Sequence, residues 1–167
     1  MQIRNEDEKE RAAVRELNIA AFGTPAKADL VDRLRRDATP LISLVAVDNE
    51  VVVGHIIFSP VLLPGRPDLR IMGLAPMAVA PERQRRGIGA ALARAGIKAC
   101  KKLGFGAIVV LGHPEYYPRF GFLPAVRFGL GCEFEAPEEV FMVLELHPGY
   151  LDSAAGTVKY HAAFNRF

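Results

Sequence analysis

Hydrophobic positions near the start of the chain recur at the spacing of amphipathic helices. After a short strand at Met1–Arg4, one apolar face is made by Ala13, Leu17, Ala20 and Ala21. Gly23-Thr24-Pro25 interrupts this pattern. The spacing then resumes, until about Asp37, with Ala28, Val31 and Leu34. The pattern predicts two successive helices with polar outer faces.

The next forty residues are typical of a β meander. Three apolar stretches are separated by the turn-forming segments Asp48-Asn49-Glu50 and Pro64-Gly65-Arg66-Pro67. These stretches predict strands over Leu41–Val47, Val51–Leu63 and Leu69–Val79. Because proline cannot donate to a sheet, we expect a break in the second strand at Pro60. In the third strand we expect an irregularity at Gly73 or Pro76.

A helix of about five turns follows Pro81-Glu82-Arg83 and ends at Gly104. Its predicted apolar face comprises Ile88, Ala91, Leu92, Ala95 and Ala99. Ala107–Leu111 is wholly apolar, as in a strand that is buried on both faces. An aromatic helix and turn over Gly112–Phe122 and a last strand at Val140–Leu146 complete the pattern. The chain therefore predicts one α/β (α+β) domain over 1–167, with a core of about 1–146 around a single sheet and an extension over 147–167.

Composition narrows the class of protein. A net charge of +2 over 167 residues does not favour a nucleic-acid binder. The first residues lack the apolar core of a signal peptide, and no run approaches the roughly 20 apolar residues of a membrane helix. Neither Cys100 and Cys132 nor the four histidines have the spacing of a metal site. We expect a cytoplasmic protein without nucleic-acid or membrane partners.

The first chemical signal lies between the third strand and the long helix. It reads Gln84-Arg85-Arg86-Gly87-Ile88-Gly89-Ala90. Backbone N–H groups at a helix N-terminus lack partners within the helix, and glycines allow an anion to approach them. The two arginines add positive charge. The segment predicts a phosphate-binding turn.

Other phosphate-binding loops fit this segment poorly. A dinucleotide fingerprint needs glycine or alanine where Leu92 stands, and it follows a βαβ unit rather than a meander. A Walker A loop needs Gly-Lys-Ser/Thr, which the chain lacks. The pyrophosphate of coenzyme A is the interpretation that remains.

Two segments resemble motifs of the GNAT superfamily of N-acetyltransferases. Val79–Leu92 resembles the acetyl-CoA signature, and Glu115–Phe122 resembles the aromatic-Tyr-x-x-x-Gly-Phe segment of that family. The tail from Gly156 to Phe164 is similar to that of the YhbS-like branch. The resemblance implies a mixed, mostly antiparallel sheet with splayed central strands and flanking helices. It also implies transfer of an acetyl group from acetyl-CoA, by direct attack, to a primary amine of a small molecule or of a protein or peptide.

The resemblance also assigns roles to residues of this chain. Backbone groups of Met77, Ala78 and Val79 would bind the pantetheine arm, and the amides from Arg85 to Ala90 would bind the pyrophosphate. The cofactor-binding set is Met77, Ala78, Val79, Gln84, Arg85, Arg86, Gly87, Ile88, Gly89, Ala90 and Tyr117. Tyr117 matches the general acid of the family, although Tyr116 and Tyr117 also fit a simple aromatic pair in the core.

The general base and the acceptor are left open. The third strand has no carboxylate after Asp68, so the amine would lose its proton through water or to His55, His113 or Glu115. Acids that would attract a cationic acceptor are Asp29, Asp32 and Glu138. A non-catalytic acyl-CoA sensor of the same fold is the alternative function, and a homodimer is the assembly to test.

Overall fold

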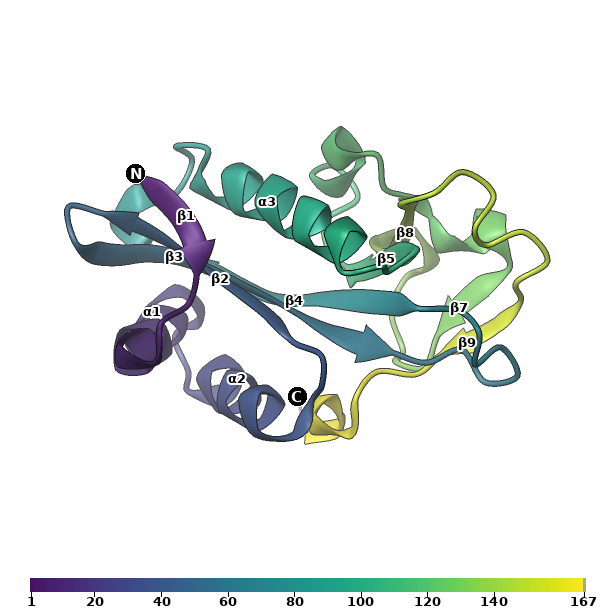
Figure 1. Ribbon diagram of the computed structural model, residues 1–167, viewed down its shortest axis with the longest axis horizontal. Coiled ribbons are helices and arrows are strands. Elements are labelled where there is room, and N and C mark those ends of the chain that lie inside the picture. Colours follow the sequence, from purple (N-terminus) through teal and green to yellow (C-terminus); the bar gives the residue numbers. More distant parts are fainter. Residues whose placement is uncertain (167) are drawn as a thin grey trace.

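A sheet of seven strands forms the centre of the molecule (Figure 1), in the order β1-β2-β3-β4-β5-β8-β6. The computed structural model describes residues 1–166. The strands of this sheet are β1 (Gln2–Asn5), β2 (Ile42–Asp48), β3 (Val51–Val61), β4 (Ile71–Val79), β5 (Ala107–Leu111), β6 (Leu123–Pro124) and β8 (Phe141–Glu145). Strands β4 and β5 pair in parallel and the other neighbours are antiparallel, which confirms the predicted mixed, mostly antiparallel sheet.

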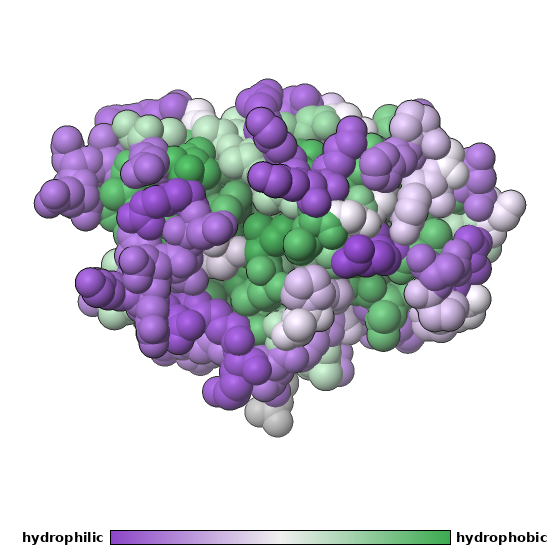
Figure 2. Space-filling view, in the orientation of Figure 1, coloured by the Kyte–Doolittle hydropathy of each residue, from purple (hydrophilic) through white to green (hydrophobic). Residues whose placement is uncertain are grey.

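Three helices cover the two faces of the sheet. Helices α1 (Arg11–Phe22) and α2 (Ala26–Asp37) lie on one face and α3 (Ile88–Lys102) lies on the other (Figure 1). Hydrophilic residues gather over α1 and α2, and a hydrophobic patch lies between these helices and α3 (Figure 2). None of the helices within residues 1–166 combines the length and the apolar character needed to cross a membrane.

Helix α3 differs from its prediction in two respects. A separate 3-10 turn at Pro81–Arg83 precedes it, so that α3 begins only at Ile88 and is shorter than five turns. Its buried residues are Ile88, Leu92, Ala93, Gly96 and Cys100, whereas Ala91, Ala95 and Ala99 are only partly buried. The predicted face is therefore rotated, because the aromatic ring of Phe58 on β3 packs against the glycine at position 96.

The central strands separate where a bulge occurs in β4. Pairing of β4 with β5 extends from Ile71 to Gly73 and ends there, although β4 continues to Val79. On its other edge, β4 shifts register against β3 between Ile56 and Phe58, opposite the segment that contains Pro76. This confirms the irregularity predicted near Pro76. The break predicted at Pro60 is wrong, because β3 continues through Pro60 to Val61 and stays paired with β4. Beyond Gly73, β4 and β5 diverge and leave the cleft described below.

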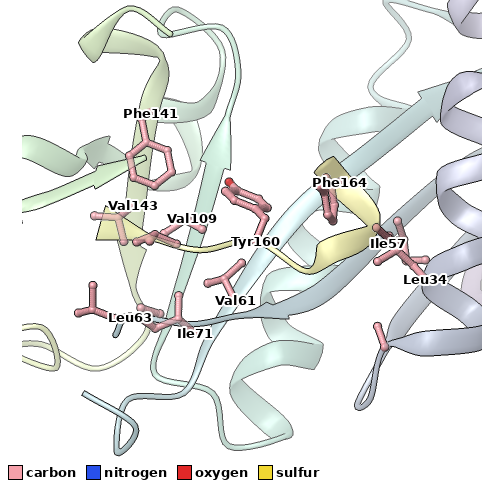
Figure 3. Close-up of a cluster of buried hydrophobic side chains, with 14 of the residues drawn as sticks. Leu34, Ile57, Val61, Leu63, Ile71, Val109, Phe141, Val143, Tyr160 and Phe164 are labelled. Carbon is pink, nitrogen blue, oxygen red and sulfur yellow. The ribbon is translucent and has the colours of Figure 1, made fainter. Parts of the chain in front are cut away.

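The end of the chain packs against the same sheet. Strand β9 (Gly156–Val158) pairs in parallel with β7 (Leu130–Cys132), and neither strand was predicted. Phe164 is buried near Leu34 of α2 and Ile57 of β3, and Tyr160 is buried over the sheet near Val61 (Figure 3). The 147–167 extension thus contributes to the core through residue 164, while Phe167 lies outside the described residues.

Candidate active site

The predicted phosphate-binding turn connects β4 to α3. Arg85 and Gly87 have positive φ angles of 65° and 83°, which turn the chain sharply before the helix. Gly87 is the N-cap of α3 and provides no side-chain acceptor for the helix. The first N–H groups of this helix of 15 residues therefore remain for an external acceptor, as predicted for an anion site.

The two glycines of the turn serve different purposes. Gly87 adopts a left-handed conformation that other residues rarely adopt. At Gly89, an added Cβ would lie 3.3 Å from the hydroxyl of Tyr116 and 3.5 Å from Cε of Met77. Glycine at position 89 keeps the groove between α3 and Tyr116 open.

A cleft of about 880 Å³ lies at the divergence of β4 and β5. Residues from both sides of the sheet line it: Phe22, Lys27, Leu74, Ala75, Pro76, Met77, Val79, Gln84, Arg85, Gly87, Ile88, Gly89, Ala90, Leu111, Gly112, His113, Tyr116, Tyr117 and Arg119. Most of the predicted cofactor-binding residues are in this set. Arg86 and Ala78 are not.

Strand alternation explains why Ala78 is outside the cleft. The N–H of Ala80 donates to Val53 O on β3 at 2.9 Å. Because backbone groups of successive residues point to opposite edges of a strand, those of Ala78 also point to β3, and those of Met77 and Val79 point to the cleft. The carbonyl of Val79 accepts a hydrogen bond of 3.1 Å from Gln84 Nε2. Gln84 thus connects the edge of β4 to the turn.

Tyr117 is positioned by close aromatic packing. Its ring makes T-shaped contacts with Tyr116 and Phe122, with centroids 5.1 and 5.7 Å apart. A Cβ at Gly112 would lie 2.2 Å from the Tyr117 ring, so only glycine allows this placement. Burial, with a smaller effect of Tyr116, raises the pKa of Tyr117 to about 12. Tyr117 therefore packs in the aromatic core and also forms part of the cleft wall.

The three side chains considered as the base lie in different environments. His55 is fully buried on β3, where its Nε2 lies 2.8 Å from Ser43 Oγ, and it does not line the cleft. Burial and, to a lesser extent, the Arg35 cation lower the pKa of His55 to about 3. Glu115 is exposed and lies outside the lining. Of the three, His113 alone lines the cleft.

The acids predicted to attract an acceptor are not at the cleft, which corrects that prediction. Asp29 lies 2.8 Å from Arg15, and Asp32 lies 2.8 Å from Arg15 and 2.9 Å from Arg35. The two pairs with Arg15 form because α1 and α2 pack side by side, whereas Asp32 and Arg35 are one turn apart on α2. Glu138 lines a separate cavity of about 190 Å³ beside β7.

Some residues of the cleft were not predicted from the sequence. Phe22 and Lys27 come from the junction of α1 and α2, and Arg119 comes from the aromatic segment, where its guanidinium stacks 4.2 Å from the Tyr116 ring centroid. Arg119 could have been predicted from the sequence, because it is a cation within the aromatic segment Glu115–Phe122. No sequence pattern pointed to Phe22 or Lys27, because they lie about fifty residues before the rest of the site.

Comparison with known proteins gives consistent results. The family model of the Acetyltransferase (GNAT) family matches residues 11–122. The uncharacterized N-acetyltransferase YhbS of Escherichia coli K12 is 38% identical over 148 residues, which are 88% of each protein. The uncharacterized N-acetyltransferase YjhQ of the same organism is 41% identical over 137 residues, which cover 80% of this chain and 76% of YjhQ.

Two solved structures are similar along nearly the whole chain. The crystal structure of Escherichia coli YhbS in complex with CoA has a TM-score of 0.93 and 37% identity, and the match covers 99% of this chain and 92% of that one. A GNAT family acetyltransferase from Brucella melitensis in complex with acetyl-CoA has a TM-score of 0.79 and 36% identity, with 98% and 97% covered. The turn, the splayed strands and these matches agree, and the chain belongs to the GNAT family of acetyltransferases.

Proposed function

We propose that this acyltransferase transfers the acetyl group of acetyl-CoA directly to a primary amine of a small molecule or peptide. The main support for this proposal is the cleft between β4 and β5. The phosphate-binding turn and the edge of β4 that β5 leaves unpaired both line this cleft. Similar proteins bind CoA and acetyl-CoA in their crystal structures, which supports the same ligand here.

The chain offers distinct groups for each part of this cosubstrate. Backbone amides from Arg85 to Ala90, at the start of α3, would bind the pyrophosphate, and the Arg85 side chain would add charge. The backbone groups of Met77 and Val79 that β5 leaves unpaired would bind the pantetheine arm. Gln84 would keep the Val79 carbonyl in place through its hydrogen bond.

Tyr117 is the proposed acid. Acetyl-CoA supplies the acyl thioester, whose C–S bond breaks when the amine nitrogen bonds to the carbonyl carbon. A pKa of about 12 keeps the phenol of Tyr117 protonated at neutral pH. It can therefore donate a hydrogen bond to the departing sulfur, whose thiol has a pKa of about 8.5. The sulfur finally gains one proton for the one that the amine loses.

His113 is the proposed base, either in direct contact with the amine or through a water molecule. It lines the cleft beside Tyr117, and its backbone carbonyl accepts from the N–H of Tyr116 at 3.0 Å. That bond anchors His113 to the segment that carries the proposed acid. Acid and base are then on one short stretch of chain.

The first test is calorimetric titration of acetyl-CoA into the wild-type protein and a Gly87→Glu/Gly89→Glu variant. Two carboxylates in the turn should repel the pyrophosphate and abolish binding, while circular dichroism shows an intact fold. Gly131→Glu is the matched control, because Gly131 is exposed, lies outside the cleft and has open space where a Cβ would be added. We expect this control to bind like the wild type.

Release of free thiol in the presence of a panel of amines then distinguishes an enzyme from a sensor. An enzyme releases CoA only when an accepted amine is present, whereas a non-catalytic sensor binds acetyl-CoA without releasing thiol. No binding by a well-folded wild type would contradict the proposed cosubstrate.

A further inference from the structure

The side chains that line the cleft include basic groups and no carboxylate of residues 1–166. Apart from Tyr116 and Tyr117, the ionisable groups of the cleft are Lys27, Arg85, His113 and Arg119. A positive cleft attracts anions and repels cations, and low-dielectric walls strengthen both effects.

The cosubstrate does not account for all of this charge. Arg85 belongs to the turn where the pyrophosphate would bind, at the start of α3. Lys27 belongs to α2, and α2 and α3 lie on opposite faces of the sheet (Figure 1). Lys27 therefore lines the cleft from the face of the sheet opposite the phosphate-binding turn.

Lys27 has no acidic partner within the described part of the chain. Its amine takes part in none of the ion pairs or side-chain hydrogen bonds of residues 1–166, although the side chain is half-buried. Asp29 is two positions away and points toward Arg15 instead. Lys27 is also in the first turn of α2, where the helix dipole disfavours a cation, so helix stability does not explain it.

Phe22 provides an apolar surface beside this cation. Phe22 is the last residue of α1, is 41% exposed and lines the same cleft. A ligand that entered here would meet an aromatic ring and an ammonium group from one helix junction. This pairing fits a small molecule that has a short apolar part and an anionic end.

We propose, on the basis of the acetyl transfer proposed above, that the acceptor is a small primary amine that also carries a carboxylate or a phosphate. Lys27 pairs with that anionic group and leaves the amine to reach the acyl carbon beside Tyr117. Polyamines and lysine-rich peptides are disfavoured, because their second positive charge meets the ammonium group of Lys27 and no carboxylate of residues 1–166 in the cleft.

The test compares matched amines by their kcat/KM for thiol release. One arm pairs amino acids with their amides, a second pairs aminoalkyl phosphates with the corresponding amino alcohols, and a third uses 1,4-diaminobutane. The anionic member of a pair should exceed its uncharged partner by roughly 10- to 100-fold, the range for a charge-assisted hydrogen bond. The first two arms show whether the anion is a carboxylate or a phosphate.

Lys27→Met should remove that preference by lowering kcat/KM for the anionic member of each pair. Lys98→Met is the control, since Lys98 is exposed on α3 and outside the cleft, and it should behave like the wild type. Calorimetry should give the same affinity for acetyl-CoA in both variants. A loss of acetyl-CoA affinity in Lys27→Met would instead assign Lys27 to the cosubstrate and overturn the proposal.

Two other outcomes separate this inference from the function on which it rests. Acetylation of the uncharged amines or the diamine at least as fast as the anionic ones overturns the anionic acceptor and leaves acetyl transfer intact. Thiol release with none of the amines contradicts acetyl transfer itself, and the acceptor class with it.

Discussion

At the scale of single residues, the placement of Tyr117 depends on the absence of a side chain at Gly112. The Tyr117 ring occupies the position that a Cβ at residue 112 would take. The aromatic neighbours then hold the ring at the cleft wall, and burial raises its pKa to about 12. The same packing that makes Tyr117 a core residue therefore keeps it a proton donor.

Replacement of Tyr117 by phenylalanine preserves the ring and removes the proton donor. We expect kcat to fall by about 10²- to 10⁴-fold, the usual contribution of general acid catalysis, with acetyl-CoA affinity nearly unchanged. In the wild type, the phenol remains protonated well below pH 12, so no decrease in kcat between pH 8 and 10 should arise from this group. Stopped-flow measurement of thiol release gives both quantities.

Tyr116→Phe is the control for this substitution. Tyr116 has its hydroxyl beside Gly89, so its loss should affect cosubstrate affinity more than kcat. If the two variants lost kcat equally, or if Tyr117→Phe retained it, Tyr117 would be a packing residue only.

At the scale of elements, the contact between α3 and β3 sets the position of the phosphate-binding turn. A Cβ at Gly54 of β3 would lie 2.9 Å from Ile88 and Leu92 of α3. A Cβ at Gly96 of α3 would lie 2.1 Å from the ring of Phe58. Glycine on both elements lets the helix lie close to the strand, with its N-terminus at the end of β4.

We expect Gly96→Ala to destabilise the protein by about 1–3 kcal/mol, because the added methyl group overlaps the rigid ring of Phe58. This cost exceeds the gain of up to about 1 kcal/mol from the better helix propensity of alanine. Urea unfolding followed by circular dichroism measures the difference.

Gly131→Ala provides the comparison, since nothing lies within 4 Å of a Cβ there. It should remain within about 0.5 kcal/mol of the wild type. A Gly96→Ala protein as stable as this control would show that α3 can move away from β3 at little cost.

At the scale of the whole molecule, a network of buried polar side chains connects α2, the segment before α1, and strands β2 and β3. Arg35 of α2 pairs with Glu6, which precedes α1, and both side chains are less than a tenth exposed. Ser43 of β2 donates to Glu6 Oε1 at 3.0 Å and lies 2.8 Å from Nε2 of His55 on β3. His55 belongs to this hydrogen-bond network. Burial and, to a lesser extent, the Arg35 cation lower the pKa of His55 and so favour its neutral form.

The lowered pKa of His55 predicts acid sensitivity. In the unfolded chain the imidazole takes a proton below about pH 6.5, whereas in the folded protein it stays neutral down to about pH 3. The unfolded state therefore binds more protons in this window, and stability falls as the pH falls from 6.5 toward 3. The slope from this group is at most about 1.4 kcal/mol per pH unit.

His55→Gln should reduce that slope, because glutamine does not titrate. Urea unfolding at several pH values between 4 and 7 measures it, and His147→Gln, at an exposed position, is the control that should keep the wild-type slope. An unchanged slope in His55→Gln would assign the acid sensitivity to other groups.

Short strands near the end of the chain illustrate what the sequence did not reveal. Leu130–Cys132 contains glycine and shows no clear alternation, and its partner strand begins at Gly156, far along the chain. β6 has two residues and depends on β8 for its pairing. Such strands are stabilised by their neighbours rather than by their own residues, so a local pattern cannot predict them.

Local sequence patterns were sufficient to predict the order of the long elements, the phosphate-binding turn and the aromatic segment with Tyr117. Each depends on residues close in the chain: helical spacing, a glycine that accepts a positive φ, and a proline beside the register shift in β4. Which charged side chains line the cleft depends instead on how the elements pack in three dimensions. Asp29 was a candidate and binds Arg15, whereas Lys27 was not and lines the site. The partner of a charged side chain is set by packing between elements, and a local sequence pattern does not encode that packing.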